Sequence, residues 1–315
     1  MLTATVIAGV GVGPAALIGC NSSEPVPTNR KAASMPTPAR VQPDIELLEP
    51  GAEPRRPLRY RLVAGAEETM SLRVGLSVET RADGAPVPIP ETPAVDMIMN
   101  LRITDLDGPD QARYRFAVQS VEIEDAPDLE PETLAAMRQG LAGAAGMSGS
   151  ARVDSRGFNW DVHMATPTNL DPMTRQMVES ASQNMDQVSA PFPKEAVGQG
   201  AVWTLRQTIE QNGVSLDQET RFELEKLDDR GGVLTTRISQ RAGTQPMPIP
   251  GLPPGAAELR GLESSGSGRV YFHLDQLVPR SSLSMRSSYQ VTVNSEGAPG
   301  LVDTVVEMRI EIAPE

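Results

Sequence analysis

Residues that usually carry enzyme chemistry are scarce in this chain. Its 315 residues include one cysteine and two histidines, and aromatic residues make up only 3% of the total. A single cysteine has no partner for an intrachain disulfide or a redox pair. Neither His163 nor His273 has a second His, Cys or carboxylate at metal-ligand spacing, and the sequence contains no Gly-x-Ser-x-Gly elbow and no P-loop. We therefore expect a protein that is not an enzyme, with no catalytic residue, no metal and no cofactor.

Basic residues are also few relative to acidic ones. Lys and Arg together number 28 against 41 Asp and Glu, which gives a formal net charge of -13. Nucleic acid and anionic lipid both favour a basic surface. The balance excludes nucleic acid as an expected partner, and it means that any membrane attachment must come from something other than basic residues. The acidic stretch 122–132 does not complete a calcium loop, so we expect a solvated acidic loop there.

The N-terminal segment has the properties of an export signal. Residues 1–19 carry no charge and are rich in small and apolar side chains. Gly and Pro interrupt the run and a polar segment follows it, which disfavours a permanent transmembrane helix. No Lys or Arg precedes the apolar run, so either the true start codon lies upstream or the signal is atypical.

The end of this segment, Leu17-Ile18-Gly19-Cys20, resembles the lipobox of bacterial lipoproteins. The resemblance implies cleavage before Cys20, acylation of its sulfur, and attachment to a membrane through the lipid. The expected location is then the cell envelope. Because some bacteria retain lipoproteins in the inner membrane through an Asp at the next position, Asn21 favours the outer membrane, facing the periplasm or the cell surface.

Composition divides the rest of the chain. Residues 20–56 are rich in Pro, Ser, Ala and charge, and such a segment cannot bury enough apolar area to offset its ordering entropy. We expect it to be a disordered tether. Behind it we expect a first β-rich repeat (57–165), a helical connector (166–198) and a second β-rich repeat (199–315).

From Leu58 onward, apolar residues alternate with polar ones. The clearest sets are Leu72/Val74/Leu76/Val78, Met97/Met99/Leu101/Ile103, Tyr114/Phe116/Val118, Phe158/Trp160/Val162 and Val302/Thr304/Val306/Met308/Ile310/Ile312. A period of two predicts antiparallel strands with one face on a core. Prolines cannot supply the amide hydrogens of a central strand, so the Pro-rich stretches 85–94 and 245–256 are expected to be edge segments or loops. The fold class is therefore α+β and mainly antiparallel β.

Two parts of the sequence match each other. AAMRQGL (135–141) corresponds to AAELRGL (256–262), and SGSARVD (148–154) corresponds to SGSGRVY (265–271). In both halves we read the order strand, turn, strand, small helical segment, strand. This order predicts two duplicated, curved, half-barrel-like sheets; the alternative is a chance match in a chain of biased composition.

Methionine is the unusual apolar residue, with 14 copies. Between the two repeats, Leu170, Met173, Met177, Ala181, Met185 and Val188 recur every three or four residues, which predicts an amphipathic helix. Methionine side chains adapt to varied apolar shapes. We therefore expect these residues to contact an apolar ligand: Met97, Met99, Trp160, Met173, Met177, Met185 and Trp203. The alternative is that methionines fill gaps in a core poor in aromatics.

The order of these elements resembles that of envelope lipoproteins in which a half-barrel wraps helices over an apolar groove, namely the lipoprotein-sorting carriers and the mycobacterial lipid-carrying lipoproteins. The resemblance implies binding of an acyl chain or another apolar ligand, without catalysis. The alternative is an envelope scaffold that binds a protein partner and has no ligand cavity. No motif in the sequence separates these two functions.

Overall fold

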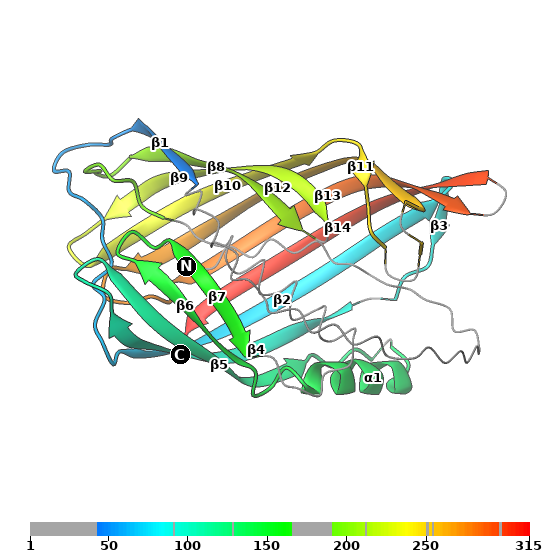
Figure 1. The fold of residues 1–315 in the computed structure, drawn as a ribbon, viewed down its shortest axis with the longest axis horizontal. Coiled ribbons are helices and arrows are strands. Elements are labelled where there is room, and N and C mark those ends of the chain that lie inside the picture. Colours follow the sequence, from blue (N-terminus) through cyan, green and yellow to red (C-terminus); the bar gives the residue numbers. More distant parts are fainter. Residues whose placement is uncertain are drawn as a thin grey trace, which may run out of the picture.

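Long antiparallel strands, built from the alternating segments, dominate the structure (Figure 1). This computed structural model describes residues 43–90, 92–127, 129–165, 191–211, 213–249, 252–253, 255–295 and 298–315. The export signal, Cys20, most of the tether and the predicted connector helix with Met173, Met177 and Met185 lie outside these residues. None of the helices described is long and apolar enough to cross a membrane.

One large sheet contains all the described strands. They are β1 (Asp44–Glu49), β2 (Glu67–Ala82), β3 (Ala85–Val87), β4 (Thr92–Leu106), β5 (Gln111–Ile123), β6 (Ser148–Asp154), β7 (Asn159–Ala165), β8 (Val202–Gln211), β9 (Val214–Leu227), β10 (Gly231–Ala242), β11 (Gln245–Pro246), β12 (Ala257–His273), β13 (Arg280–Ser295) and β14 (Ala298–Pro314). Their order in the sheet is β1-β8-β9-β10-β12-β13-β14-β2-β4-β5-β6-β7, with β3 added to β2 and β11 to β12. The sheet is open, because its two end strands, β1 and β7, do not pair with each other within the described part. The expected antiparallel β class is confirmed.

The strands of the two expected repeats belong to the same sheet. β14, the last strand of the second repeat, pairs along most of its length with β2, the first long strand of the first repeat. The duplication itself stays a prediction. The second expected helical segment is wrong: 135–141 lies in the helix α1 (Pro131–Ala142), whereas 256–262 lies almost wholly in β12. The difference has a physical reason, because Ala257, Leu259 and Leu262 are buried against the sheet, whereas α1 has no buried residue.

Part of the segment expected to be a disordered tether forms the strand β1. Residues 44–49 were expected to be disordered, yet they pair with β8. Ile45 and Leu47 lie opposite Leu205 and Trp203 and pack against the same apolar cluster. Two alternating apolar residues are enough to hold this short strand on the sheet edge.

The Pro-rich stretches contribute short edge segments, as predicted, except that the end of the first one, residues 92–94, opens β4, which lies inside the sheet between β2 and β5. β3 adds only three residues to β2, and β11 adds only two residues to β12. Met247 and Ile249, which follow β11, pack on a small apolar cluster around Leu259. Proline therefore limits each stretch to a short pairing at the margin of the long strands.

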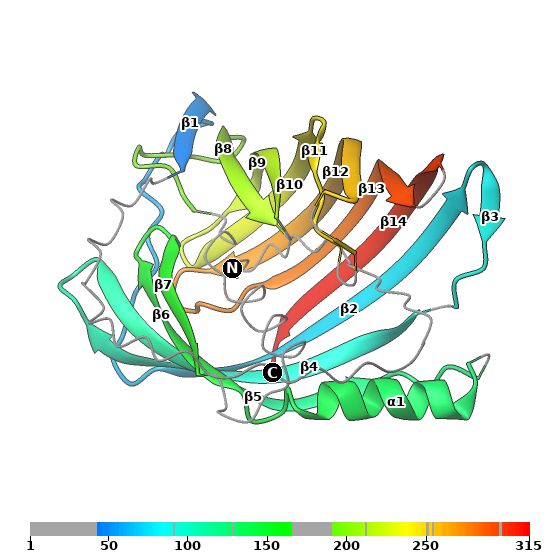
Figure 2. The ribbon, with the colours of Figure 1, turned by 45° about the vertical axis from the view of Figure 1, so that its right-hand side comes forward.

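The sheet curls so that β5, β6 and β7 turn toward the same side as the apolar face of β13 and β14. Figure 2 shows β5, β6 and β7 turning away from the plane of the long strands. Phe116 of β5 and Val162 of β7 belong to the same buried cluster as Met285 of β13 and Met308 of β14. The apolar face of the curved sheet is thus its inner face, and exposed charged residues such as Arg237 and Arg309 alternate with the buried ones and lie on the outer face.

Candidate functional site

Methionines gather on the inner face of the curved sheet. The first apolar cluster contains Met70, Met97, Met99, Met147, Met164, Met285 and Met308, half of the 14 in the chain. The strand register brings four of them together, because Met70 lies opposite Met99 and Met285 lies opposite Met308. Sequence reasoning selected Met97 and Met99 but did not identify Met70, although Met70 extends the alternation of Leu72 and Val74 by one step.

A small cavity lies within this cluster. It has a volume of about 40 Å³, and its described lining includes Met70, Met99, Phe116, Tyr114 and Tyr60. Met99 is almost fully buried, and Met97 is half-buried beside it. Burial, with a smaller contribution from the nearby Glu68 carboxylate, raises the pKa of Tyr60 well above its usual value. The Tyr60 hydroxyl therefore stays neutral over the physiological pH range.

Trp203, another predicted ligand contact, lies in the second apolar cluster. Its side chain is fully buried and stacks on Phe222, with 5.6 Å between ring centroids and 20° between ring planes. Its Nε1 donates a hydrogen bond to the carbonyl of Pro191 at 3.2 Å. The structure gives Trp203 a packing role, and ligand contact there stays a prediction.

Trp160 lies on a different face from the one its spacing predicts. It was expected to share a face with Val162, but Trp160 pairs with Arg152 on the outer face, whereas Val162 is buried in the inner cluster. Asp161 has a positive φ of 56°, and the pairing of β6 with β7 shifts at this point. A β-bulge adds one residue to a strand and reverses the alternation beyond it, which explains why the expected shared face is wrong.

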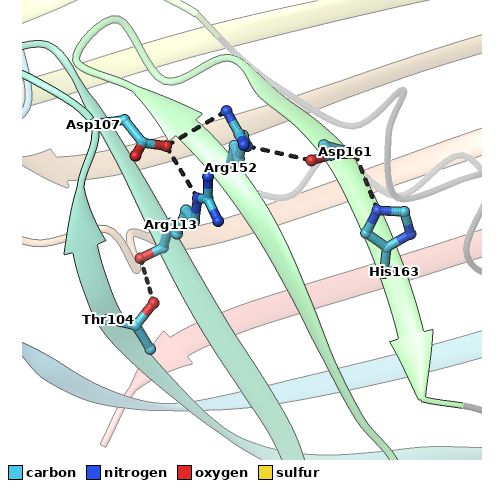
Figure 3. A network of polar contacts seen from close by, with 6 residues as sticks. All are labelled: Thr104, Asp107, Arg113, Arg152, Asp161 and His163. Atoms are coloured by element: carbon cyan, nitrogen blue, oxygen red, sulfur yellow. Dashed lines mark hydrogen bonds and ion pairs between the residues drawn. The ribbon is translucent and has the colours of Figure 1, made fainter. Parts of the chain in front are cut away.

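The outer face around this bulge carries a chain of ion pairs (Figure 3). Asp107 lies 3.1 Å from Arg113 and 3.4 Å from Arg152, and Arg152 lies 3.2 Å from Asp161. The ring of His163 extends this chain, with Nε2 3.0 Å from the second Asp161 oxygen. The histidine is 72% exposed, and these contacts join β5, β6 and β7 on the solvent side.

The described residues contain no cluster of three or more His, Cys, Asp or Glu side chains that could hold a metal ion. His163 has one carboxylate beside it, and His273 is exposed at the end of β12 opposite Gly231.

A row of polar residues, three of them buried and one half-buried, crosses the inner face. Gln218, Gln240, Ser264 and Ser287 lie opposite one another on β9, β10, β12 and β13. Gln240 Nε2 donates to Gln218 Oε1 at 2.7 Å, and Ser264 Oγ donates to Ser287 Oγ at 2.8 Å. The row separates the apolar cluster around Leu259 from the methionine cluster. The sequence does carry a signal for this row, because Gln218 and Gln240 occupy positions of the alternating pattern at which apolar residues are otherwise found.

A hollow larger than the inner cavity lies on the outer face. It is a groove of about 1120 Å³. Its floor is formed by β10, β12, β13, β14 and β2, and its wall by Pro90, residues 92–94, residues 124–127 and Leu129. The floor carries serines, arginines and two glutamates, Glu307 and Glu311, which alternate along the strands with buried apolar residues such as Met285 and Met308. The wall combines prolines and alanines with Glu124 and Asp125. Sequence analysis missed this groove, since its residues come from strands that are far apart in the chain.

No protein-family model matches the sequence, and no curated protein matches it.

Proposed function

We propose that this chain is an envelope lipoprotein, anchored through acylated Cys20, that holds an acyl chain or another apolar ligand against the inner face of its sheet and catalyses no reaction. The observation that carries the proposal is the gathering of seven methionines on that face, two of which, Met70 and Met99, line a cavity. Unbranched thioether side chains change rotamer at low energetic cost. A cavity that holds about one water in its present shape can therefore widen to admit an apolar chain.

The test uses the full chain with Cys20→Ser, purified from cells, extracted with organic solvent and analysed by mass spectrometry. Our proposal expects a defined lipid in stoichiometric amount. Met99→Phe should remove this lipid, because the larger ring fills the cavity beside Met70. Met247→Phe is the matched control, since Met247 packs on a different cluster, and it should leave the lipid in place.

The anchor has its own test. Cells expressing the wild-type chain and Cys20→Ala are labelled with a radioactive fatty acid. The wild-type chain should carry the label and the variant should not. A wild-type chain without label would contradict the anchor and leave the ligand question to the extraction experiment.

An envelope scaffold is the second candidate function. The small volume of the inner cavity favours the scaffold, because a protein with no room for a ligand inside would act by binding a partner through its surface. A chain that purifies without lipid and recovers one consistent protein partner in proximity labelling would favour the scaffold over the lipid carrier.

A further inference from the structure

The groove on the outer face has two chemically different sides. Pro93 is buried in its wall, and Ala126 and Leu129 are half-buried there, so these three residues give this side an apolar surface. The same side carries two exposed carboxylates, Glu124 and Asp125, which are paired with Arg73 and Arg138. The floor opposite is polar. It combines Gly75 and several serines with charged side chains of both signs, namely Arg73, Arg237, Arg286, Arg309, Glu307 and Glu311. A groove with one apolar and one polar side fits an amphipathic molecule.

Unpaired cations lie on the floor. One register row crosses it in the order Arg237, Ser267, Ser284, Arg309, one residue from each of β10, β12, β13 and β14. Both arginines are exposed, and neither makes an ion pair or a hydrogen bond within the described part of the chain. The two serines between them are small, so the long arginine side chains can extend toward each other above two free hydroxyls.

The neighbouring charged residues contrast with this pair. Arg73 at the edge of the groove holds Asp96 at 2.8 Å and Glu124 at 2.7 Å, and Arg286 in the next row is paired with Glu307. On a chain of net charge -13, the overall field repels anions, so binding of an anion requires a local cationic site. Arg237 and Arg309 are such a site, with guanidinium groups that can bind an oxyanion through two parallel hydrogen bonds each.

We propose that this groove binds an anionic amphiphile, with its phosphate or carboxylate between Arg237 and Arg309 and its apolar part along Pro93, Ala126 and Leu129 of the wall. The volume of about 1120 Å³ is in the range of sites for whole organic ligands and exceeds what a bare ion needs. This inference goes beyond the proposed function, since it concerns the opposite face of the sheet from the methionine cluster.

Calorimetric titration of the full chain with Cys20→Ser tests the proposal with three probes. Dodecyl phosphate, kept below its micelle concentration, should bind at least tenfold more tightly than inorganic phosphate and at least tenfold more tightly than neutral dodecyl maltoside. The first difference reports the apolar wall, and the second reports the cationic floor. Equal affinity for the two dodecyl compounds would overturn the proposal.

Variants place the binding in the groove. Arg237→Gln combined with Arg309→Gln should weaken dodecyl phosphate binding at least tenfold. Arg241→Gln should leave it unchanged, because Arg241 is an exposed arginine on the same strand outside the groove. Met99→Phe should also leave it unchanged, which separates this site from the inner cavity. Circular dichroism checks that each variant is folded.

A vesicle arm distinguishes the two sources of the anionic group. Flotation with phosphatidylglycerol vesicles reports docking on headgroups in a bilayer, whereas the titration reports a monomeric amphiphile. Binding of the monomer with no more flotation than for the double variant supports the proposal. Flotation without monomer binding would overturn it in favour of a bilayer-surface contact.

Discussion

Replacement of Trp203 separates a packing role from a ligand-binding role at this position. The indole is fully buried, stacks on Phe222 and donates to the Pro191 carbonyl. Trp203→Ala removes the ring and leaves a cavity. Trp203→Phe keeps a ring against Phe222 but removes the Nε1 donor. A packing residue should lose stability in both variants, and by more in the first.

The structure sets the expected size of each loss. Truncation of a buried aromatic side chain to Ala costs about 3–5 kcal/mol, from lost burial together with the cavity left behind. In Trp203→Phe the Pro191 carbonyl loses its partner, and an unsatisfied buried polar group costs about 1–3 kcal/mol. The free energy of unfolding should therefore fall in the order wild type, Trp203→Phe, Trp203→Ala.

Urea denaturation followed by far-ultraviolet circular dichroism measures both losses, since the variants remove one of only two tryptophans and would change the fluorescence signal. Tyr271→Phe is the matched control, because Tyr271 is 45% exposed on β12, and it should change the free energy of unfolding by less than about 0.5 kcal/mol. A loss below about 1 kcal/mol in Trp203→Ala, with an unchanged denaturant slope, would refute the packing assignment.

Three further predictions concern stability. Gly149→Val should destabilise the fold by about 1–3 kcal/mol in urea denaturation, because a Cβ there would lie 2.3 Å from Phe116 Cζ; Gly75→Val, with open space around it, should not, and equal losses would contradict the reasoning. Backbone amide donors lower the pKa of Asp228, so its contribution to folding stability is present above the pKa of Asp in the unfolded chain and is lost as pH falls below about 4. The free energy of unfolding of Asp228→Asn should therefore depend less on pH in this acidic range, and an unchanged pH dependence would exclude the effect. Burial raises the pKa of Tyr60, so its contribution to folding stability is present below about pH 10 and is lost as pH rises further. The free energy of unfolding of Tyr60→Phe should therefore fall less steeply with rising alkaline pH than that of the wild type, and an equally steep fall would contradict this.

The strand content and the edge segments could be predicted because they depend on local chemistry. Alternation such as that of Leu72 and Val74 reflects the side-chain period of a strand, and proline limits pairing wherever it occurs. The same local reasoning was wrong at Trp160, where the bulge at Asp161 reverses the alternation, and at 256–262, where burial against the sheet favours a strand.

The sites could be predicted only in part. Met99 was selected for its residue type, and it does line a cavity. Met70 lies opposite it on the neighbouring strand β2, but Met285 and Met308 come from strands far along the chain, and Arg237 reaches the same groove as Arg309 only through the register of four strands.

By itself the sequence determined the antiparallel strands, the edge role of the prolines and the scarcity of catalytic side chains, because each follows from residue type and short-range spacing. The tertiary structure alone decided that β14 pairs with β2 to make one open sheet, that the methionines meet on its inner face, and that unpaired arginines share a groove on its outer face. The physical reason is that strand order and register arise from the mutual burial of distant apolar faces, and no local pattern records which faces will meet.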